Sequence, residues 1–476
     1  MQPRTVILTL CIPTLLNGKK GVNYVNIFAK LFKTAETFFA EYLSFVKYSS
    51  FAPNNQYSDY LNTVNANELN ISALNLQPTK AFITNASFSN PLNYDTAWAN
   101  DKVAIKRPIR VMMLGLRGFP NVQGGVETHA EHLSPLLVGL GCDLEVLVRS
   151  NYQQASTGKQ WNGVKFTKLW APKSKGLETL VHTFLGVLYA AIKRPDILHI
   201  HAIGPALMTP LARLLGLKVV VTHHGPDYNR QKWGGLARNM LLLGEWVGMR
   251  FSNSRIVISN VIRDMVVRKH TMHAELIHNG VVLPNLNVSE SHLEQFGLIK
   301  NKYILLVSRL VPEKRHLDLI KAFNQASLSD VKLVLVGSSD HPDDYLQALM
   351  KSSADNPNIV LTGFQTGDTL RSLYTHAALF VLPSSHEGLS ISLLEALSYG
   401  LPVIASDIPA NLELGLNSSC YFELGNVDKL SQLLSENISQ PATLETRMYL
   451  RAWISSHYNW KRIAEKTYKE YYSIFQ

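Results

Sequence analysis

Two glutamates eight residues apart, Glu387 and Glu395, are the side chains of this sequence best placed to bind a polar ligand together. An apolar run at 379–382 precedes them, and a helical pattern covers 390–399. If the whole stretch were helical, the two carboxylates would be about 12 Å apart. Any helix offers such a spacing, so the pair alone also fits a solvated helix with two unrelated acids.

The residues between the glutamates add a second feature. A strand, a turn and a helix start follow one another here, and a helix start leaves backbone N–H groups without intrahelical partners. Its partial positive charge also attracts anions. We therefore expect the N–H groups of Gly388, Leu389 and Ser390 to face an anionic ligand. A nucleoside-diphosphate sugar fits this pattern, because a carboxylate could bind each sugar while the diphosphate lies between them.

Two cations and a glycine pair occupy comparable places at other strand ends. Arg309 and Lys314 follow the apolar run 303–307, where they could clamp a diphosphate and stabilise it as a leaving group. Gly124 and Gly125 precede a helical pattern, so the backbone could approach a ligand closely there. Neither the dinucleotide fingerprint nor the Walker loop occurs, which disfavours a nicotinamide dehydrogenase.

These segments belong to a repeated alternation of strands and helices. Apolar runs at 111–116, 144–148, 197–200 and 219–222 alternate with helix-like sequence, and the rhythm restarts after Asn287. Continuous apolar strands of this kind are typical of parallel sheets covered on both faces. The fold class is therefore α/β, with two facing Rossmann-like domains whose strand ends line one cleft.

The chain divides into four predicted parts. An N-terminal extension covers 1–105, a first Rossmann-like domain 106–290, a second 291–455, and a C-terminal helix 456–476 that packs back towards the first domain. Low hydrophobicity favours a poorly ordered extension. The aromatic stretch 25–48 leaves open a helix that contacts a membrane surface or a partner.

Bulk composition narrows the class of partner. The formal net charge of +10 suits a ligand with phosphates or an anionic membrane surface, and no alternation of basic and aromatic residues supports nucleic acid. The 3 cysteines offer neither a disulfide framework nor a metal-ligand spacing, which favours the cytoplasm. No apolar run reaches the roughly 18–20 residues of a spanning helix. Peripheral contact with the inner membrane surface stays open, although 236–251 is better explained as a core helix.

From residue 110 to the C-terminus the sequence resembles the retaining glycosyltransferases of family 4, which have the GT-B fold. Four segments match the family and come in its order: the glycine turn, Thr222–Gly225, Arg309 with Lys314, and 387–395. The match continues from the glutamate pair through Ala396–Val403. The segment 116–128 resembles a subgroup from bacterial surface-polysaccharide pathways.

The resemblance implies a role for each matching residue on the donor side. Glu387 would contact the transferred sugar and Glu395 the ribose, while Arg309 and Lys314 would hold the diphosphate. Gly125, beside Gly124, would approach the diphosphate from the first domain.

The resemblance also implies where the base and the reacting sugar lie. The backbone at Gly363 and Phe364 would meet the nucleobase, and His224 would lie near the reacting sugar. The acceptor would be a glycan or a lipid-linked glycan, and no metal or other cofactor is expected.

The sequence identifies acceptor-side residues less specifically than donor-side residues. Asp227, Arg230 and Lys232 follow His224 in an expected loop and are candidates for the acceptor side. His201, at the end of a strand, either lies near the acceptor or is satisfied by the backbone. The pair Asp343–Asp344 is interpreted as solvated rather than as a metal site.

The sequence favours transfer with retained configuration, in which a donor phosphate oxygen takes the acceptor proton, because no convincing nucleophile stands out. Three other functions remain open on this scaffold. They are a sugar phosphorylase, a nucleotide-sugar epimerase or hydrolase, and a protein that only binds nucleotide sugars or scaffolds a complex.

Overall fold

The computed structural model describes five segments of the chain: residues 107–153, 157–173, 177–230, 234–339 and 343–476. The predicted extension 1–105, its aromatic stretch and Lys232 lie outside these segments. Among the described residues, no helix is long and apolar enough to cross a membrane.

The first sheet has eight strands in the order β3-β4-β2-β1-β5-β6-β7-β8. All neighbours are parallel except β3 and β4. The strands are β1 Ile109–Leu114, β2 Cys142–Arg149, β3 Gln160–Trp161, β4 Val164–Leu169, β5 Ile197–His201, β6 Val219–His223, β7 Ser254–Val257 and β8 Glu275–Leu276.

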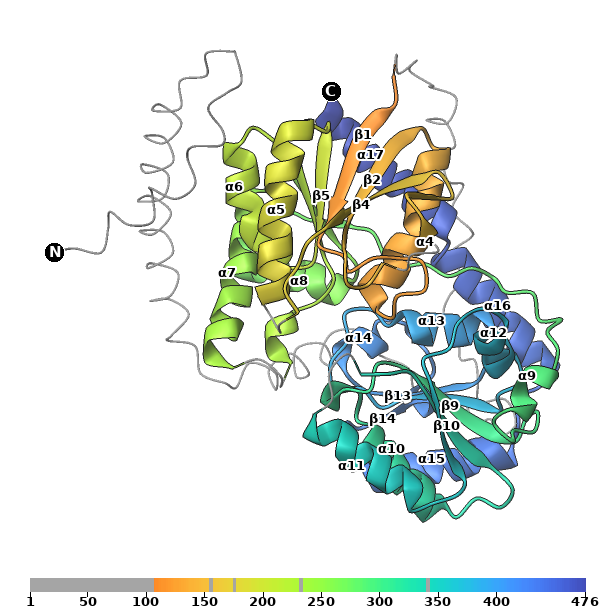
Figure 1. The fold of residues 1–476 in the computed structure, drawn as a ribbon. Coiled ribbons are helices and arrows are strands. Elements are labelled where there is room, and N and C mark those ends of the chain that lie inside the picture. Colours follow the sequence, from red (N-terminus) through yellow and green to blue (C-terminus); the bar gives the residue numbers. More distant parts are fainter. Residues whose placement is uncertain (1–106, 154–156, 174–176, 231–233, 340–342) are drawn as a thin grey trace, which may run out of the picture. The chain divides into compact units, whose positions relative to one another are not determined.

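Helices cover both faces of this sheet, and β1 shows why its sequence is apolar throughout. Met112 and Leu114 belong to one hydrophobic cluster, whereas Val111 and Met113 belong to another. Alternate side chains of a strand point to opposite faces, so both faces are buried. Figure 1 shows α5, α6 and α7 on one side, and α4 and α17 on the other. The helices of this part are α4 Gly125–Gly139, α5 Leu177–Lys193, α6 Thr209–Leu214, α7 Gly235–Phe251 and α8 Asn260–His270, with short helices η3 Pro205–Met208 and η4 Asp227–Asn229.

The second sheet has six strands in the order β11-β10-β9-β12-β13-β14, and every neighbouring pair is parallel. The strands are β9 Tyr303–Val307, β10 Lys332–Val336, β11 Ile359–Gly363, β12 Leu379–Leu382, β13 Val403–Ser406 and β14 Tyr421–Phe422. Its helices are α9 Ser291–Glu294, α10 His316–Ala326, α11 Asp344–Ala354, α12 Gly367–Thr375, α13 Ile391–Ser398, α14 Pro409–Leu412, α15 Val427–Ser439 and α16 Leu444–His457, with η5 Pro312–Lys314 and η6 Ser418–Cys420.

The last helix, α17 (Trp460–Phe475), leaves the second sheet and packs on the first. Trp460, Ile463 and Tyr471 join the hydrophobic cluster of β1 and α4. The Tyr471 hydroxyl lies 2.6 Å from His199 Nδ1 on β5. The chain end is therefore part of the core beneath the first sheet.

The predicted α/β class with two Rossmann-like parts is confirmed, and α7 contributes Val247 and Met249 to the core. Two local expectations differ from the structure. The first strand ends at Leu114 rather than 116, and the helix after Glu387 begins at Ile391. The side chain of Ser390 accepts a hydrogen bond from Leu393 N, and such a cap fixes the helix start.

Candidate active site

The glycine turn before α4 is closed by a buried ion pair. The Arg117 guanidinium contacts the carboxylate of Glu127 and the carbonyl of Gln123, with Nε 3.1 Å from Glu127 Oε1. Burial opposes ionisation of Glu127, but Arg117 holds its pKa below the ordinary value. Gly124 has φ 152°, and a Cβ there would collide with the Glu127 carboxylate. Only glycine therefore fits this turn.

Gln123 joins this turn to the second sheet. Its Nε2 donates to the carbonyl of Ser308 at 3.3 Å, and its Oε1 accepts from Ser338 N at 3.2 Å and from Ser338 Oγ at 2.7 Å. Ser308 follows β9 and Ser338 follows β10. The carboxyl ends of both sheets therefore face each other across one amide side chain.

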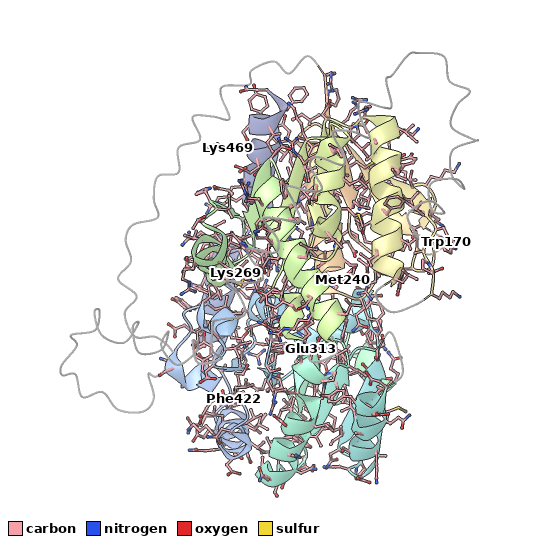
Figure 2. The ribbon with its side chains drawn as sticks, turned by 90° about the vertical axis from the view of Figure 1, so that its left-hand side faces the viewer. Trp170, Met240, Lys269, Glu313, Phe422 and Lys469 are labelled. Atoms are coloured by element: carbon pink, nitrogen blue, oxygen red, sulfur yellow. The ribbon has the colours of Figure 1, made fainter. Side chains whose placement is uncertain are left out.

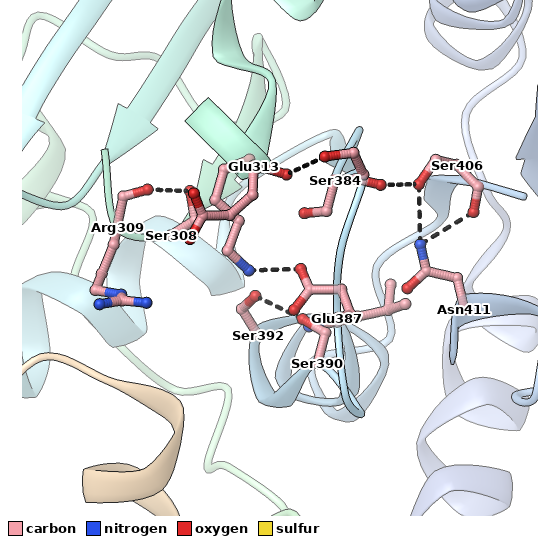
Figure 3. Close-up of polar contacts among 12 residues, drawn as sticks. Ser308, Arg309, Glu313, Ser384, Glu387, Ser390, Ser392, Ser406 and Asn411 are labelled. Carbon is pink, nitrogen blue, oxygen red and sulfur yellow. Dashed lines mark hydrogen bonds and ion pairs between the residues drawn. The ribbon is translucent and has the colours of Figure 1, made fainter. Parts of the chain in front are cut away.

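Lys314 and Glu387 form an ion pair in the second part of the chain. Lys314 Nζ lies 2.5 Å from Glu387 Oε1, and the two side chains are 15% and 9% exposed. Burial opposes ionisation of Glu387, but the Lys314 ammonium holds its pKa below the ordinary value. Figure 3 shows Glu387 between the turn that carries Ser390 and the segment that carries Glu313. A cation and a carboxylate thus meet at one point.

The loop before α13 also touches the first part of the chain. A Cβ on Gly388 would collide with the carbonyl oxygen of His224. Asn279 Nδ2 donates to the carbonyl of Leu389 at 2.8 Å. Since Glu387 precedes the helix, the stretch between the glutamates is not all helical, and the separation of about 12 Å for a continuous helix does not apply. The turn at 388–390 instead lets Glu387 reach Lys314.

Glu395 lies on α13 beside Tyr374, whose hydroxyl donates to it at 3.0 Å. Burial raises the pKa of this carboxyl, although His132 and Tyr374 oppose the rise. Glu395 lines a cavity of about 340 Å³ together with His132, Arg371 and Trp460. It therefore has room beside it for a polar ligand.

Four histidines gather where β5 and β6 end, next to α4. His201 Nδ1 lies 3.1 Å from His224 Nε2, and His129 Nδ1 lies 2.9 Å from Asn279 Oδ1. Among the described residues, the ring nitrogens of His129, His201 and His224 could hold a metal ion, since they lie within 4.8 Å of one another. His199 is buried, as expected of a packed strand residue.

Burial keeps these imidazoles neutral. It lowers the pKa of His129 to about 4 and that of His199 to about 3. The pKa values of His201 and His224 fall well below 6.5 because of burial and the neighbouring rings. His201 is completely buried and bonds to the side chain of His224 rather than to the backbone, and its proximity to the acceptor stays a prediction.

A buried network fixes the turn that carries His224. Gly225 N donates to His223 Nδ1 at 3.1 Å, and His223 Nε2 donates to Glu245 at 3.2 Å. Glu245 also accepts from Lys269 at 2.6 Å and lies 2.8 Å from His270 Nε2. Burial opposes ionisation of Glu245, but these partners hold its pKa well below the ordinary value.

The acceptor-side candidates lie beside the Lys314 segment. Arg230 pairs with Asp227 at 2.7 Å and with Glu313 at 3.6 Å. Glu313 is 4% exposed, and its carboxylate oxygens accept no hydrogen bond within the described part of the chain. Arg230 therefore bridges the two parts of the molecule next to Glu387.

The remaining donor-side candidates lie at strand ends of the second sheet. Gly363 ends β11 with φ 71°, and Phe364 is 40% exposed. Arg309 follows Ser308, and the Ser308 hydroxyl donates a hydrogen bond to the carbonyl oxygen of Arg309 (Figure 3).

Sequence reasoning missed His129, Asn279 and Gln123. His129 follows the glycine turn by one helical turn, which was an available signal. Asn279 and Gln123 gave no signal, because their partners are distant in sequence.

Two family models match in tandem along this fold. "Glycosyltransferase Family 4" matches residues 123–283, and "Glycosyl transferases group 1" matches residues 289–452. The two matches correspond to the two sheets. The chain is a GT-B glycosyltransferase of the family 4 type.

Sequence relatives of this chain include other glycosyltransferases. It is 25% identical to an uncharacterised glycosyltransferase of Methanocaldococcus jannaschii, over 64% of this chain and 82% of the relative. It is 26% identical to the UDP-Gal:alpha-D-GlcNAc-diphosphoundecaprenol alpha-1,3-galactosyltransferase of Escherichia coli, over 52% of this chain and 68% of the relative.

Solved structures show the same fold. The sucrose-phosphate synthase of Thermosynechococcus elongatus superposes with a TM-score of 0.65 at 19% identity, covering 77% of this chain and 99% of that one. Anabaena HepE in complex with UDP-glucose gives a TM-score of 0.62 at 18% identity, covering 76% and 99%.

Proposed function

We propose that this glycosyltransferase moves a hexosyl group from a nucleotide-diphosphate sugar to a glycan or lipid-linked acceptor, with retention of configuration, in cell-surface polysaccharide synthesis. The observation that carries this proposal is the Lys314–Glu387 pair, with Lys314 Nζ 2.5 Å from Glu387 Oε1. Lys314 follows Ser308 by six residues, and Gln123 of the glycine turn contacts Ser308 and Ser338.

The pair explains how the diphosphate leaves. Lys314 exchanges part of its contact with Glu387 for phosphate oxygens when the donor binds, and Arg309 adds a planar cation. Cations placed before the reaction stabilise the negative charge that develops on the diphosphate. Glu387 is then available to bind hydroxyls of the sugar. We propose that this cation set acts without a metal ion.

Retention follows when attack and departure occur on one face of the sugar. The bond from the anomeric carbon to the phosphate oxygen breaks, and the acceptor oxygen forms a bond on the same face. The acceptor proton passes to an oxygen of the departing phosphate. His224 lies near the sugar, Glu395 binds the ribose, and the backbone at Gly363 and Phe364 meets the base.

The acceptor assignment is supported by the E. coli relative, whose name specifies a diphosphoundecaprenol-linked sugar as its acceptor. An exposed apolar strip supports peripheral contact with the cytoplasmic face of the membrane. Leu177, Phe184 and Ile192 of α5 are exposed, as is Trp170, which projects outward (Figure 2). Such residues enter the interfacial region of a bilayer.

The test is a donor-turnover assay with UDP, GDP, ADP and dTDP sugars, with and without a polyprenyl-diphosphate-linked sugar. Release of the nucleoside diphosphate that depends on the acceptor, with a product anomer matching the donor by NMR, is the expected result. Release without acceptor indicates a hydrolase, and release that requires inorganic phosphate indicates a phosphorylase. An inverted product contradicts the proposed mechanism.

A further inference from the structure

The histidines at the ends of β5 and β6 use their ring nitrogens unequally. His199 uses both, with Nδ1 2.6 Å from the Tyr471 hydroxyl and Nε2 2.7 Å from Thr222 Oγ1. His201 bonds to His224 through Nδ1, while its Nε2 is buried without a hydrogen-bond partner in the described part of the chain. The imidazole pair His201–His224 therefore has one unsatisfied buried atom.

Heavy-atom positions leave two proton arrangements for this pair, because each neutral ring carries one proton. In the first, His224 donates from Nε2, and His201 must then carry its own proton on the buried Nε2. In the second, His201 donates from Nδ1, so its buried Nε2 is a bare lone pair. The proton of His224 then lies on Nδ1.

The two arrangements differ in what is left unsatisfied. The first buries an N–H group without an acceptor, and the second buries an acceptor without a donor. Buried backbone N–H groups without partners are rarer than under-satisfied backbone carbonyls, and we extend this preference to the imidazole nitrogens. The second arrangement is therefore favoured, with the Nδ1–H of His224 not used by any described residue.

We propose that His201 is a positioning residue that fixes His224 in the tautomer protonated at Nδ1, so that His224 donates a hydrogen bond to an oxygen of the bound nucleotide sugar. His224 is partly exposed, and its carbonyl touches Gly388 of the donor loop. The identity of the ligand rests on the proposed function, whereas the tautomer does not. In this form His224 cannot accept the acceptor proton through Nδ1.

A metal ion is the competing arrangement, since the three nitrogens of His129, His201 and His224 lie close together. Coordination by both His201 Nδ1 and His224 Nε2 would require both atoms to be unprotonated. The pair lies at 3.1 Å, an ordinary hydrogen-bond separation, so a hydrogen bond accounts for the contact without an ion. His129 is held separately, by Asn279.

The tautomer can be measured directly, without a substrate, by NMR of the full-length protein with ¹⁵N-labelled histidine. Signals are assigned with the His224→Gln and His201→Asn variants. We expect His224 to show a protonated Nδ1 and an unprotonated Nε2, unchanged by EDTA. A proton on Nε2 of His224, or a spectrum that EDTA changes, overturns the proposal.

Variants of His201 connect the tautomer to turnover. His201→Asn keeps an N–H donor near Nδ1, so we expect the Nδ1–H tautomer of His224 and near-normal donor turnover. His201→Leu removes the donor, and we expect mixed tautomers and about tenfold slower turnover. His182→Leu is the matched control, because His182 is a buried histidine on α5 outside the site.

The outcomes separate the two proposals. Loss of the Nδ1–H tautomer in His201→Leu with unchanged turnover contradicts the role given to His201. Equal loss of turnover in the Leu and Asn variants, with the tautomer intact in Asn, contradicts it as well. Absence of any transfer by the wild-type protein, with the expected tautomer present, counts against the proposed function alone.

Discussion

Lys314 and Glu387 form an ion pair in the candidate active site that also affects folding. Both side chains are largely removed from water, at 15% and 9% exposure. Removing one partner of such a pair leaves the other charge without compensation, whereas removing both charges is often tolerated. The pair therefore allows stability and activity to be separated by mutation.

We expect Lys314→Met and Glu387→Gln each to lower the free energy of unfolding by roughly 3 kcal/mol, the low end of the range for buried pairs. The double variant should regain much of that loss, because neither charge is then unpaired. All three variants should lose at least about 100-fold in turnover, since the leaving group lacks its cation or the sugar its carboxylate. Chemical denaturation and the donor assay give the two quantities.

A double variant that transfers sugar at nearly the wild-type rate would contradict the roles proposed for Lys314 and Glu387. Additive losses of stability would show that the two charges do not interact as the 2.5 Å separation indicates.

Single residues were predictable where a motif surrounds them. Glu387 and Lys314 follow apolar strands of recognisable sequence, so the strand ends bring them to one edge. The contact between His199 and Tyr471 of α17 was not predictable, because the two residues are 272 positions apart in the sequence.

At the scale of elements, contacts between loops of the two sheets position the site. Gln123 precedes α4 and reaches the residues after β9 and β10. These strand ends carry Ser308, next to Arg309, and Ser338. The amide of Gln123 therefore holds the glycine turn against these two strand ends.

We predict that Gln123→Ala raises the donor KM about tenfold with a smaller effect on kcat, because the turn loses its contact with the second sheet. Ser338→Ala should have a similar but smaller effect, since Ser338 N remains. The double variant should cost less than the sum, which a double-mutant cycle measures. Independent effects of the two substitutions would show that the contact does not position the turn.

Elements with strong apolar runs were predicted closely. The expected strands 303–307 and 379–382 coincide with β9 and β12. The strands β4 and β7 were missed because polar residues alternate in them, as in Lys165 and Arg255. The start of α13 depends on the Ser390 cap, which competes with a helix running from Glu387.

At the scale of the whole molecule, buried histidines make folding sensitive to acid. Burial lowers the pKa of His129 and His182 to about 4, and that of His199 and His316 to about 3. These values lie below the ordinary value near 6.5. At pH values between the lowered native pKa and the ordinary pKa, the unfolded chain binds more protons than the native protein. The free energy of unfolding therefore rises with pH in this window and is lost as pH falls.

We expect stability to be nearly constant above pH 7 and to fall steeply from pH 6.5 towards pH 5. Each such histidine costs up to about 1.4 kcal/mol per pH unit, so four cost on the order of 8 kcal/mol at pH 5. That is comparable with the whole stability of a typical domain. Urea unfolding followed by circular dichroism at several pH values measures the slope.

His182→Leu should flatten this slope by about one proton, since His182 lies outside the site. A wild-type stability that stays level from pH 7 to pH 5 would show that these imidazoles are not held neutral by the fold.

The restart of the strand–helix rhythm after Asn287 predicted two sheets, and both were found. The eight-stranded order of the first sheet was not predictable, because sequence patterns do not state which strands are neighbours. The contacts of Gln123, Asn279 and Arg230 across the two parts arise only once both sheets are placed.

The central claim is that a nucleotide-diphosphate sugar binds at the Lys314–Glu387 pair. Thermal unfolding of the wild type and of Lys314→Met, with UDP, GDP, ADP and their sugars, tests it most directly. At about 100 times Kd, a ligand adds about 2.7 kcal/mol of stability, so at least one should raise the Tm of the wild type by several degrees. The variant should show little rise. No rise with any nucleotide, or an equal rise in the variant, would contradict the account.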